Sequence, residues 1–223
     1  MTACEVSESI DQLVDRARAL IGGRERVLLG ITGPPGAGKS TVAEKLVRTL
    51  GPQLAVLVPM DGYHLANEVL DALGRHERKG APDTFDADGY VALIRRLKDQ
   101  PNAAAIGRDQ IVYAPRFVRR IEEPIGSSIP VPSSVPLVVT EGNYLLVDEP
   151  PWSDLAWLLD EVWYLCPPDA KRIEWLIQRH QHYGRSPEEA HDRAHGSDQR
   201  NAELIERTAF RGDYLVHVTP TDA

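Results

Sequence analysis

Residues 33–40 read Gly-Pro-Pro-Gly-Ala-Gly-Lys-Ser and follow the run VLLGITG at 27–33. The run is short, apolar and rich in β-formers, which predicts a buried strand. Residues 40–50 carry apolar side chains at helical spacing, which predicts a helix directly after the glycine-rich turn. A G-x-x-x-x-G-K-[S/T] turn between a strand and a helix presents backbone N–H groups to phosphate oxygens. The stretch therefore predicts a site for the phosphates of a nucleoside triphosphate, which we take to be ATP.

The chemistry of that loop assigns a task to several of its residues. The helix that follows points its positive end at the anion. Lys39 is expected to reach the β- and γ-phosphates, and the Ser40 hydroxyl is expected to be a ligand of Mg²⁺. The residues expected to contact the nucleotide are Gly33, Pro34, Pro35, Gly36, Ala37, Gly38, Lys39, Ser40 and Thr41.

Four further apolar runs read as strands, and helical patterns separate them. They lie at 54–60, 137–142, 161–166 and 214–218, so the sequence predicts five strands in all. Strands that alternate with helices predict an α/β fold: a mainly parallel sheet with helices on both faces. A chain of 223 residues suits one domain, which we place at 1–223. Ligands of such sheets bind beyond the carboxyl ends of the strands.

Composition limits the classes of partner. The formal net charge is −8, which argues against a general nucleic-acid binder. Cys4 and Cys166 are too few for a disulfide framework or a zinc cluster, and their usage fits reduced thiols. The N-terminal residues show no secretory signal, and no run approaches eighteen apolar residues. We therefore expect a cytoplasmic protein that does not bind nucleic acid or membranes.

Two carboxylates follow predicted strands directly. Asp61 comes after the strand 54–60, and Glu141 comes after the strand that begins at 137. Both are therefore expected at the edge of the sheet that carries the phosphate loop. Transfer of a phosphoryl group to a hydroxyl needs metal ligands and a group that accepts the hydroxyl proton. We assign the role of proton acceptor to Asp61 and a place near Mg²⁺ to Glu141. The spacing leaves the reverse assignment open, and it also allows Asp61 to be a simple turn residue before Gly62.

Four segments resemble one kinase family. They are GITGPPGAGKST at 30–41, MDGYH at 60–64, RKGAPDTFD at 78–86 and TEGNYLL at 140–146. Through these four segments the chain resembles the uridine kinase, pantothenate kinase and phosphoribulokinase family, over roughly residues 24–218. It is most similar to the bacterial branch labelled nucleoside/nucleotide kinase or fructose-transport-system kinase. The resemblance implies a P-loop three-layer sandwich with strand order 2-3-1-4-5, an acceptor-binding insertion at about 62–125 and a helical lid at about 172–196.

The resemblance also implies residue roles. Asp61 matches the family's catalytic aspartate, and Glu141 matches the acidic residue near the metal, so the implied metal site comprises Ser40, Glu141 and Asp61. The lid is expected to place arginines on the phosphates, and Asn201 matches a segment of the bacterial branch. Val118 stands where relatives often carry Asp. The implied acceptor contacts are Tyr63, His64, Arg78, Lys79, Phe85 and Asp86, and the implied lid arginines are Arg172, which would bind the nucleotide, and Arg179 and Arg185, which would act in catalysis.

Other residues leave two interpretations open. Arg116, Arg119 and Arg120 form a basic cluster that either binds an anionic group of the acceptor or is a solvated surface. The four tryptophans are expected to pack in the core, with the alternative left open that one of them lines the pocket.

Two functions follow. The first is an ATP-dependent phosphotransferase that acts on a hydroxyl of a small metabolite: a nucleoside, a sugar or a pantothenate-like alcohol. The alternative is a regulatory NTPase or nucleotide-driven switch that acts on a protein partner. A guanine-specific switch typically carries N-K-x-D after a late strand, whereas residues 167–172 read PPDAKR. The oligomeric state stays open, with a homodimer possible.

Overall fold

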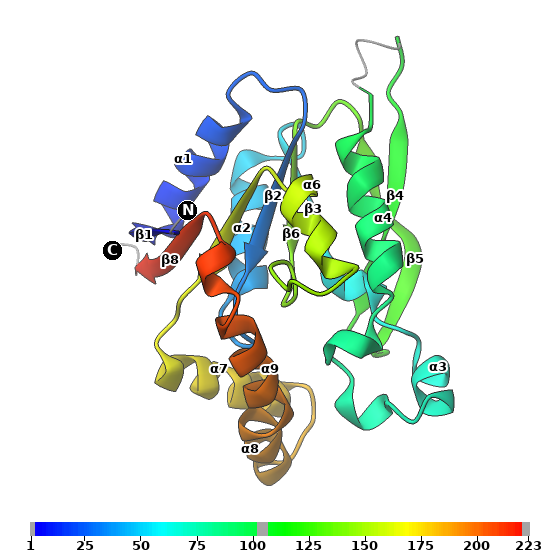
Figure 1. The fold of residues 1–223 in the computed structure, drawn as a ribbon, viewed down its shortest axis with the longest axis vertical. Coiled ribbons are helices and arrows are strands. Elements are labelled where there is room, and N and C mark those ends of the chain that lie inside the picture. The colour runs from blue at the N-terminus through cyan, green and yellow to red at the C-terminus, as the bar shows by residue number, and fades with distance from the viewer. Residues whose placement is uncertain (1–2, 102–106, 220–223) are drawn as a thin grey trace.

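Six parallel strands form the central sheet of the computed structural model, which describes residues 3–101 and 107–219. The strands lie in the order β1, β8, β7, β2, β6 and β3 (Figure 1). Their bounds are Cys4–Ser9 for β1, Val27–Thr32 for β2, Ala55–Pro59 for β3, Leu137–Glu141 for β6, Glu161–Leu165 for β7 and Tyr214–Thr219 for β8.

The predicted order is confirmed for the five strands that the sequence identified, but the predicted count is wrong. The sixth strand, β1, pairs in parallel with β8, with Cys4 opposite Tyr214. Its sequence CEVSES is mostly polar, and most of its residues are exposed or half-buried. An edge strand of this kind lacks the apolar run or strict alternation by which strands are identified.

Helices cover both faces of the sheet. Two pack on one face through Leu13, Ala17 and Leu46, which meet inward side chains of β2 such as Leu29. The opposite face carries Leu28 and Val58 and is covered by a helix with Tyr90 and Ile94. These helices are α1 (Ile10–Ile21) and α2 (Lys39–Leu50) on the first face, and α4 (Ala87–Lys98) with the short α6 (Leu155–Leu158) on the second.

Side-chain caps begin three of the helices. Ser9 and Gln12 form a capping box at α1, and Ser186 and Glu189 form another at the helix Pro187–His195. Asp86 accepts a hydrogen bond from Gly89 N at the start of α4. Side-chain acceptors at these positions satisfy N–H groups that have no partner within the helix.

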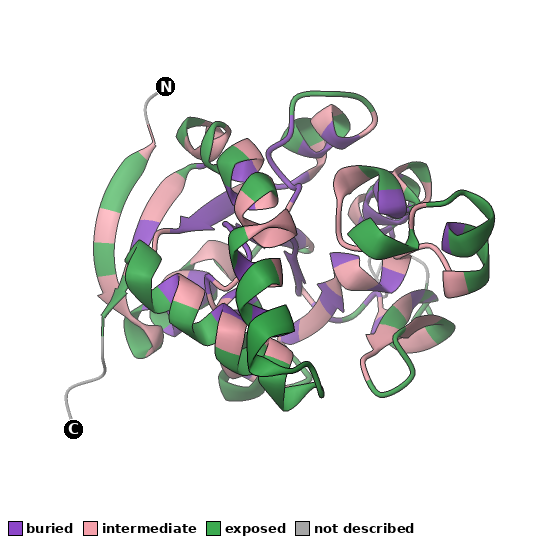
Figure 2. Cartoon of the chain, turned by 90° about the horizontal axis from the view of Figure 1, so that it is seen from below, coloured by how far each residue is buried: buried purple, intermediate pink, exposed green. Residues whose placement is uncertain are grey.

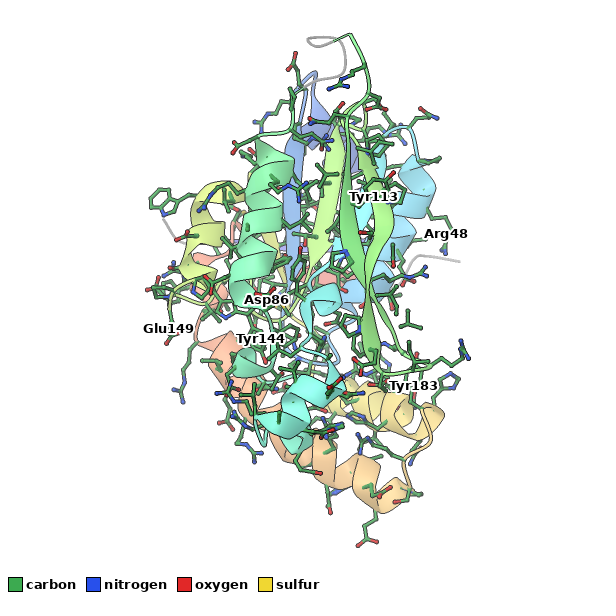
Figure 3. The ribbon with its side chains drawn as sticks, turned by 90° about the vertical axis from the view of Figure 1, so that its right-hand side faces the viewer. Arg48, Asp86, Tyr113, Tyr144, Glu149 and Tyr183 are labelled. Atoms are coloured by element: carbon green, nitrogen blue, oxygen red, sulfur yellow. The ribbon has the colours of Figure 1, made fainter. Side chains whose placement is uncertain are left out.

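A two-stranded antiparallel hairpin lies beside α4, formed by β4 (Ile111–Val118) and β5 (Glu123–Pro132). Its inner side chains, Val112, Ala114 and Val131, join the core that α4 covers. In Figure 3 Tyr113 lies on the upper part of this hairpin, and Tyr183 lies below its lower end. The predicted insertion at 62–125 thus comprises α3 (Asn67–Ala72), α4, β4 and the start of β5.

Three helices gather below the carboxyl ends of the strands in Figure 1: α7 (Asp169–His182), α8 (Pro187–His195) and α9 (Ser197–Glu206). The view from below shows buried residues on the central strands and mostly exposed residues on the surrounding helices (Figure 2). In the described ranges, no helix combines the length and the apolar character that crossing a membrane requires.

Candidate active site

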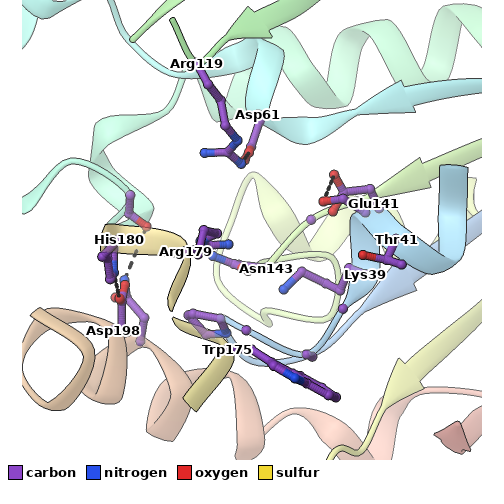
Figure 4. Close-up of a pocket in the computed structure, with 18 of the residues that line it drawn as sticks. Lys39, Thr41, Asp61, Arg119, Glu141, Asn143, Trp175, Arg179, His180 and Asp198 are labelled. Atoms are coloured by element: carbon purple, nitrogen blue, oxygen red, sulfur yellow. Dashed lines mark hydrogen bonds and ion pairs between the residues drawn. The ribbon is translucent and has the colours of Figure 1, made fainter. Parts of the chain in front are cut away.

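A cleft of about 1660 Å³ opens at the carboxyl edge of the sheet. Its walls come from the phosphate loop, the ends of β3 and β6, the loop that contains Lys79, the tip of the β4–β5 hairpin and the helices α7 to α9. Figure 4 shows Lys39, Glu141, Asp61 and Arg179 around the same space. Segments far apart in sequence therefore meet at one site, as expected for parallel strands that end at a shared edge.

The phosphate loop packs tightly on α7 at Gly36. Its φ is 82°, and a Cβ at this position would lie 2.7 Å from the Arg172 carbonyl oxygen. Only glycine fits both the left-handed conformation and this close approach. The Lys39 ammonium donates to the carbonyl oxygens of Gly33 and Pro34, at 2.9 and 3.0 Å. Residues from Pro35 to Thr41 line the cleft.

Arg172 supports this loop from behind. Its side chain is only 1% exposed. It donates to Pro35 O at 3.4 Å and to Gln199 Oε1 at 2.7 Å, and it pairs with Asp169. Arg172 is not among the cleft-lining residues of the described chain. Its contacts therefore join α7 and α9 to the back of the phosphate loop.

A tight turn places Asp61. After β3 the chain enters a 3-10 turn at Met60–Tyr63, with Gly62 packed under the hairpin. A Cβ at Gly62 would lie 2.6 Å from Pro115 O, so the turn and β4 are in direct contact. The Asp61 carboxylate accepts a hydrogen bond from Arg119 Nη2 at 3.1 Å. It is 28% exposed and can meet a ligand in the cleft.

Glu141 and Lys39 form the buried charged part of the site. Glu141 ends β6, is 5% exposed and accepts a hydrogen bond from Ser40 Oγ at 3.2 Å. Burial raises the pKa of Glu141, and the nearby Asp61 charge raises it further. Burial lowers the pKa of Lys39, against the attraction of Glu141. The charged forms of Glu141 and Lys39 are thus both costly at these buried positions. A bound cation would supply the counter-charge to Glu141, and a phosphate would supply it to Lys39.

Aromatic and basic side chains form the wall opposite the phosphate loop. His64 Nδ1 donates to the carbonyl oxygen of Asp61 at 2.8 Å. Its ring packs against Phe85 and Phe117, with centroids 4.0 and 4.7 Å away. The Lys79 ammonium lies 5.2 Å from the centre of the Phe117 ring. This wall combines apolar surface with a cation, a combination that suits a small polar molecule.

The sequence profile of the phosphoribulokinase / uridine kinase family matches residues 28–223. The chain belongs to this family. It is 34% identical to a proposed uridine kinase of Schizosaccharomyces pombe, across 93% of this chain and 90% of that protein. As a P-loop kinase, the chain can therefore be compared with its relatives of known structure.

Two solved structures share its fold. A protein of Silicibacter sp. TM1040 with a proposed role as a fructose transport system kinase is 35% identical, with a TM-score of 0.81. The match covers 93% of this kinase and 98% of that chain. YFH7 of Saccharomyces cerevisiae, a proposed P-loop kinase with a circular permutation, has a TM-score of 0.81 at 19% identity and covers 96% and 100% of the two chains. This second likeness concerns the fold alone.

The donor set of the cleft fits the ATP and Mg²⁺ that the family implies. Ser40 and Glu141 are already in contact, and Lys39 lies beside them. Among the residues that the structure describes, no three His, Cys, Asp or Glu side chains cluster as a metal site. Mg²⁺ typically takes one or two protein ligands and completes its shell with water and phosphate oxygens. A hydroxyl and a carboxylate beside a phosphate loop match that requirement.

Most sequence-predicted site residues of this kinase meet in the cleft. Apart from the phosphate loop, the predicted residues that line it are Asp61, His64, Lys79, Phe85, Glu141, Arg179, Arg185 and Asn201. Arg179 is exposed toward the cleft, yet the surrounding protein lowers the pKa of its guanidinium, and the charge of Arg119 adds to this effect. The roles assigned to these residues stay predictions.

Besides Arg172 and Arg116, five predicted contacts do not line the cleft of the described chain: Gly33 and Pro34, whose carbonyls hold Lys39 from behind, and Tyr63, Arg78 and Asp86. The Tyr63 ring packs edge-on against Tyr90, and burial raises the pKa of its hydroxyl to about 12. Arg78 forms a surface ion pair with an aspartate, and Asp86 caps α4, as described above.

Two of the three arginines in the basic cluster reach the site. Phe117, Arg119 and Arg120 line the cleft, whereas Arg116 is exposed and does not line the cleft of the described chain, and neither does Val118. β4 ends at Val118, so Arg119 and Arg120 lie in the turn between β4 and β5. The predicted acceptor contact from Arg116 therefore lies outside the cleft, and the turn brings its two neighbours there instead.

Sequence reasoning also missed residues on the helices. Arg193, Asp198 and His180 line the cleft, and His180 Nε2 lies 2.7 Å from Asp198 Oδ2. No motif marks them in the sequence. The expected core position is wrong for two of the four tryptophans, because Trp157 and Trp175 are 87% and 45% exposed. Trp175 lines the cleft, which is the alternative that the sequence left open for one of them.

Proposed function

We propose that the protein transfers the γ-phosphoryl group of ATP to a hydroxyl group of a small metabolite. The observation that carries the proposal is the position of Asp61. Its carboxylate shares one cleft with Lys39, Ser40 and Glu141, but comes from a different strand end. The cleft also extends beyond the phosphate loop to a wall of aromatic and basic side chains, which gives room for a second substrate.

The proposed reaction assigns one step to each group. The acceptor hydroxyl gives its proton to the Asp61 carboxylate as its oxygen attacks the γ-phosphorus. The bond between the γ-phosphorus and the bridging oxygen breaks, and ADP leaves with that oxygen. Lys39 and Arg179 stabilise negative charge on the transferring group. Ser40 and Glu141 would hold Mg²⁺, which would supply positive charge to the phosphates of ATP.

Arg119 holds the proposed base in place. Its Nη2 donates to Asp61 Oδ2 at 3.1 Å, and its guanidinium also lies over the rings of Phe117 and Tyr183, each at 5.8 Å. It therefore links the base to the hairpin and to the end of α7.

The acceptor class includes nucleosides, sugars and pantothenate-like alcohols. Relatives are named for uridine and for fructose transport, so both uridine and fructose are candidates. The alternative function is a regulatory NTPase whose output is a shape change in a protein partner. Such a switch needs the phosphate loop but no acceptor wall beside a proton-accepting carboxylate.

A screen for acceptor-dependent ADP release tests the proposal. The purified protein is incubated with Mg²⁺ and ATP and a panel that includes uridine, fructose and pantothenate. Asp61→Asn is compared with Asp88→Asn, a matched change at an exposed residue of α4. We expect one acceptor class to stimulate ADP release, Asp88→Asn to retain it, and Asp61→Asn to lose it while still binding ATP. ATP hydrolysis that no small alcohol stimulates would favour the regulatory alternative.

A further inference from the structure

The loop that presents Lys79 to the cleft is bound from behind by two helices. Arg193 of α8 donates from Nη2 to Lys79 O at 2.9 Å and from Nη1 to Glu77 O at 3.5 Å. Asn201 of α9 donates to Gly80 O at 3.3 Å, and the Tyr144 hydroxyl donates to the same oxygen. Three carbonyl oxygens of this one loop are thus held by side-chain donors.

The front of the loop connects to the acceptor wall. Lys79 Nζ donates to Asn67 Oδ1 at 2.5 Å and to Glu122 O at 2.6 Å. Asn67 begins α3, and Glu122 lies at the tip of the hairpin. Lys79 therefore joins the two outer parts of the wall, and its position depends on the backbone that Arg193 holds.

Arg193 of α8 differs from Arg179 of α7 and from Arg185 in the turn that follows α7, which also line the cleft. Within the described residues, the side chains of Arg179 and Arg185 make no hydrogen bond, so they are free to meet a phosphate group. Arg193 is half-buried and donates from both Nη groups to backbone carbonyls. Burial lowers the pKa of its guanidinium, and the charge of Arg185 contributes.

We propose that Arg193 is a positioning residue that locks the loop at 76–85 to α8, so that the lid and the acceptor wall move as one unit. The inference rests on the proposed function, because it assigns the loop to the acceptor. Its physical basis is that charge-assisted hydrogen bonds to the Glu77 and Lys79 carbonyls fix this backbone segment more firmly than one neutral bond would. Closing of α8 over the nucleotide would then carry Lys79 into place on the acceptor.

Hydrogen exchange tests the lock without knowledge of the acceptor. Arg193→Gln is compared with Arg200→Gln, a matched change at an exposed arginine of α9. In the protein without ligands, we expect amides of 76–85 to exchange roughly tenfold faster in Arg193→Gln, since about one net hydrogen bond of the loop's stability is lost. Strand β6 should keep its protection in both variants, which shows that the fold is intact.

A second measurement separates positioning from a merely structural role. With Mg²⁺ and a non-hydrolysable ATP analogue, the wild type is expected to gain protection in both α8 and 76–85. Arg193→Gln is expected to gain it in α8 alone, with an unchanged Kd for the analogue, and Arg193→Lys is expected to restore part of the coupling. If Arg193→Gln does not fold, Arg193→Lys and Asn201→Ala serve in the same comparison.

The outcomes separate this proposal from the function proposed above. If the amides of 76–85 exchange at equal rates in Arg193→Gln and Arg200→Gln, the proposed lock is overturned, whether or not the protein is a kinase. If the ATP analogue protects neither α8 nor the phosphate loop of the wild type, that result counts against the kinase function. The comparison without ligands still shows whether Arg193 locks the loop to α8.

Discussion

Arg172→Met tests whether this buried arginine supports the phosphate loop or contacts the nucleotide itself. Methionine keeps much of the side chain's apolar length but removes every donor. Pro35 O and Gln199 Oε1 would each lose the donor described above. The ion pair to Asp169 adds little, because that carboxylate is 74% exposed.

The magnitude follows from these contacts. Each buried acceptor left without a donor costs about 1–3 kcal/mol. Removal of the buried charge returns part of that cost, since the guanidinium no longer has to be desolvated. We expect a net loss of about 2 kcal/mol in the free energy of unfolding, which lowers the Tm of a domain of this size by about 4–8 °C. If about 1.4 kcal/mol of this appears as loss of order in the loop, the Kd for ATP rises about tenfold.

Calorimetric titration with ATP and with ADP distinguishes the two roles. A support acts on the whole loop, so the affinity for both nucleotides should fall by the same factor. If Arg172 instead contacted the γ-phosphate, its replacement would lower the affinity for ATP and leave the affinity for ADP unchanged. Lys171→Met is the control, because it is a neighbouring change at a side chain that is 61% exposed. A loss confined to ATP, with an unchanged Tm, would refute the supporting role.

Two other changes probe the acceptor side of the cleft. Gly62→Ala places a methyl group within 2.6 Å of Pro115 O, so the turn must shift and carry Asp61 with it; we expect roughly a hundredfold lower kcat with unchanged ATP binding. Gly126→Ala, where a Cβ meets nothing within 4 Å, should match the wild type in both measurements, and equal kcat in the two variants would contradict the argument. Burial lowers the pKa of His64, so the unfolded chain binds its proton first as the pH falls through about 6.5. The free energy of unfolding should therefore fall below that pH in the wild type, by up to about 1.4 kcal/mol per pH unit from this group, and a urea titration series on His64→Phe should show a smaller slope.

The core of the fold could be predicted because its signals are local. The run at 27–33 is buried throughout β2, and the glycine-rich turn and α2 follow it as expected. The helix caps at Ser9, Asp86 and Ser186 are local in the same sense, because each side chain accepts from the backbone N–H three residues further on. β1 could not be predicted in this way, because its pairing partner, β8, lies about 200 residues away and its own side chains are polar.

The site divides along the same line. Residues at strand ends, such as Asp61 and Glu141, were placed correctly at the cleft, because parallel strands end at a common edge. Arg172 was assigned to the nucleotide, but the structure places it behind the phosphate loop, since helix register rather than residue type decides which arginines face the cleft. Arg193 has no sequence signal, because its partners are backbone carbonyls of a distant loop.

The most direct measurement of the proposed chemistry is phosphorus NMR of the reaction mixture with the acceptor found by the screen. The proposed chemistry predicts a new phosphomonoester signal that grows in step with ADP. In Asp61→Asn the rate should fall by about 10²–10⁴-fold while Mg²⁺–ATP still binds. Inorganic phosphate as the sole product, or a phosphomonoester formed by Asp61→Asn at the wild-type rate, would contradict it.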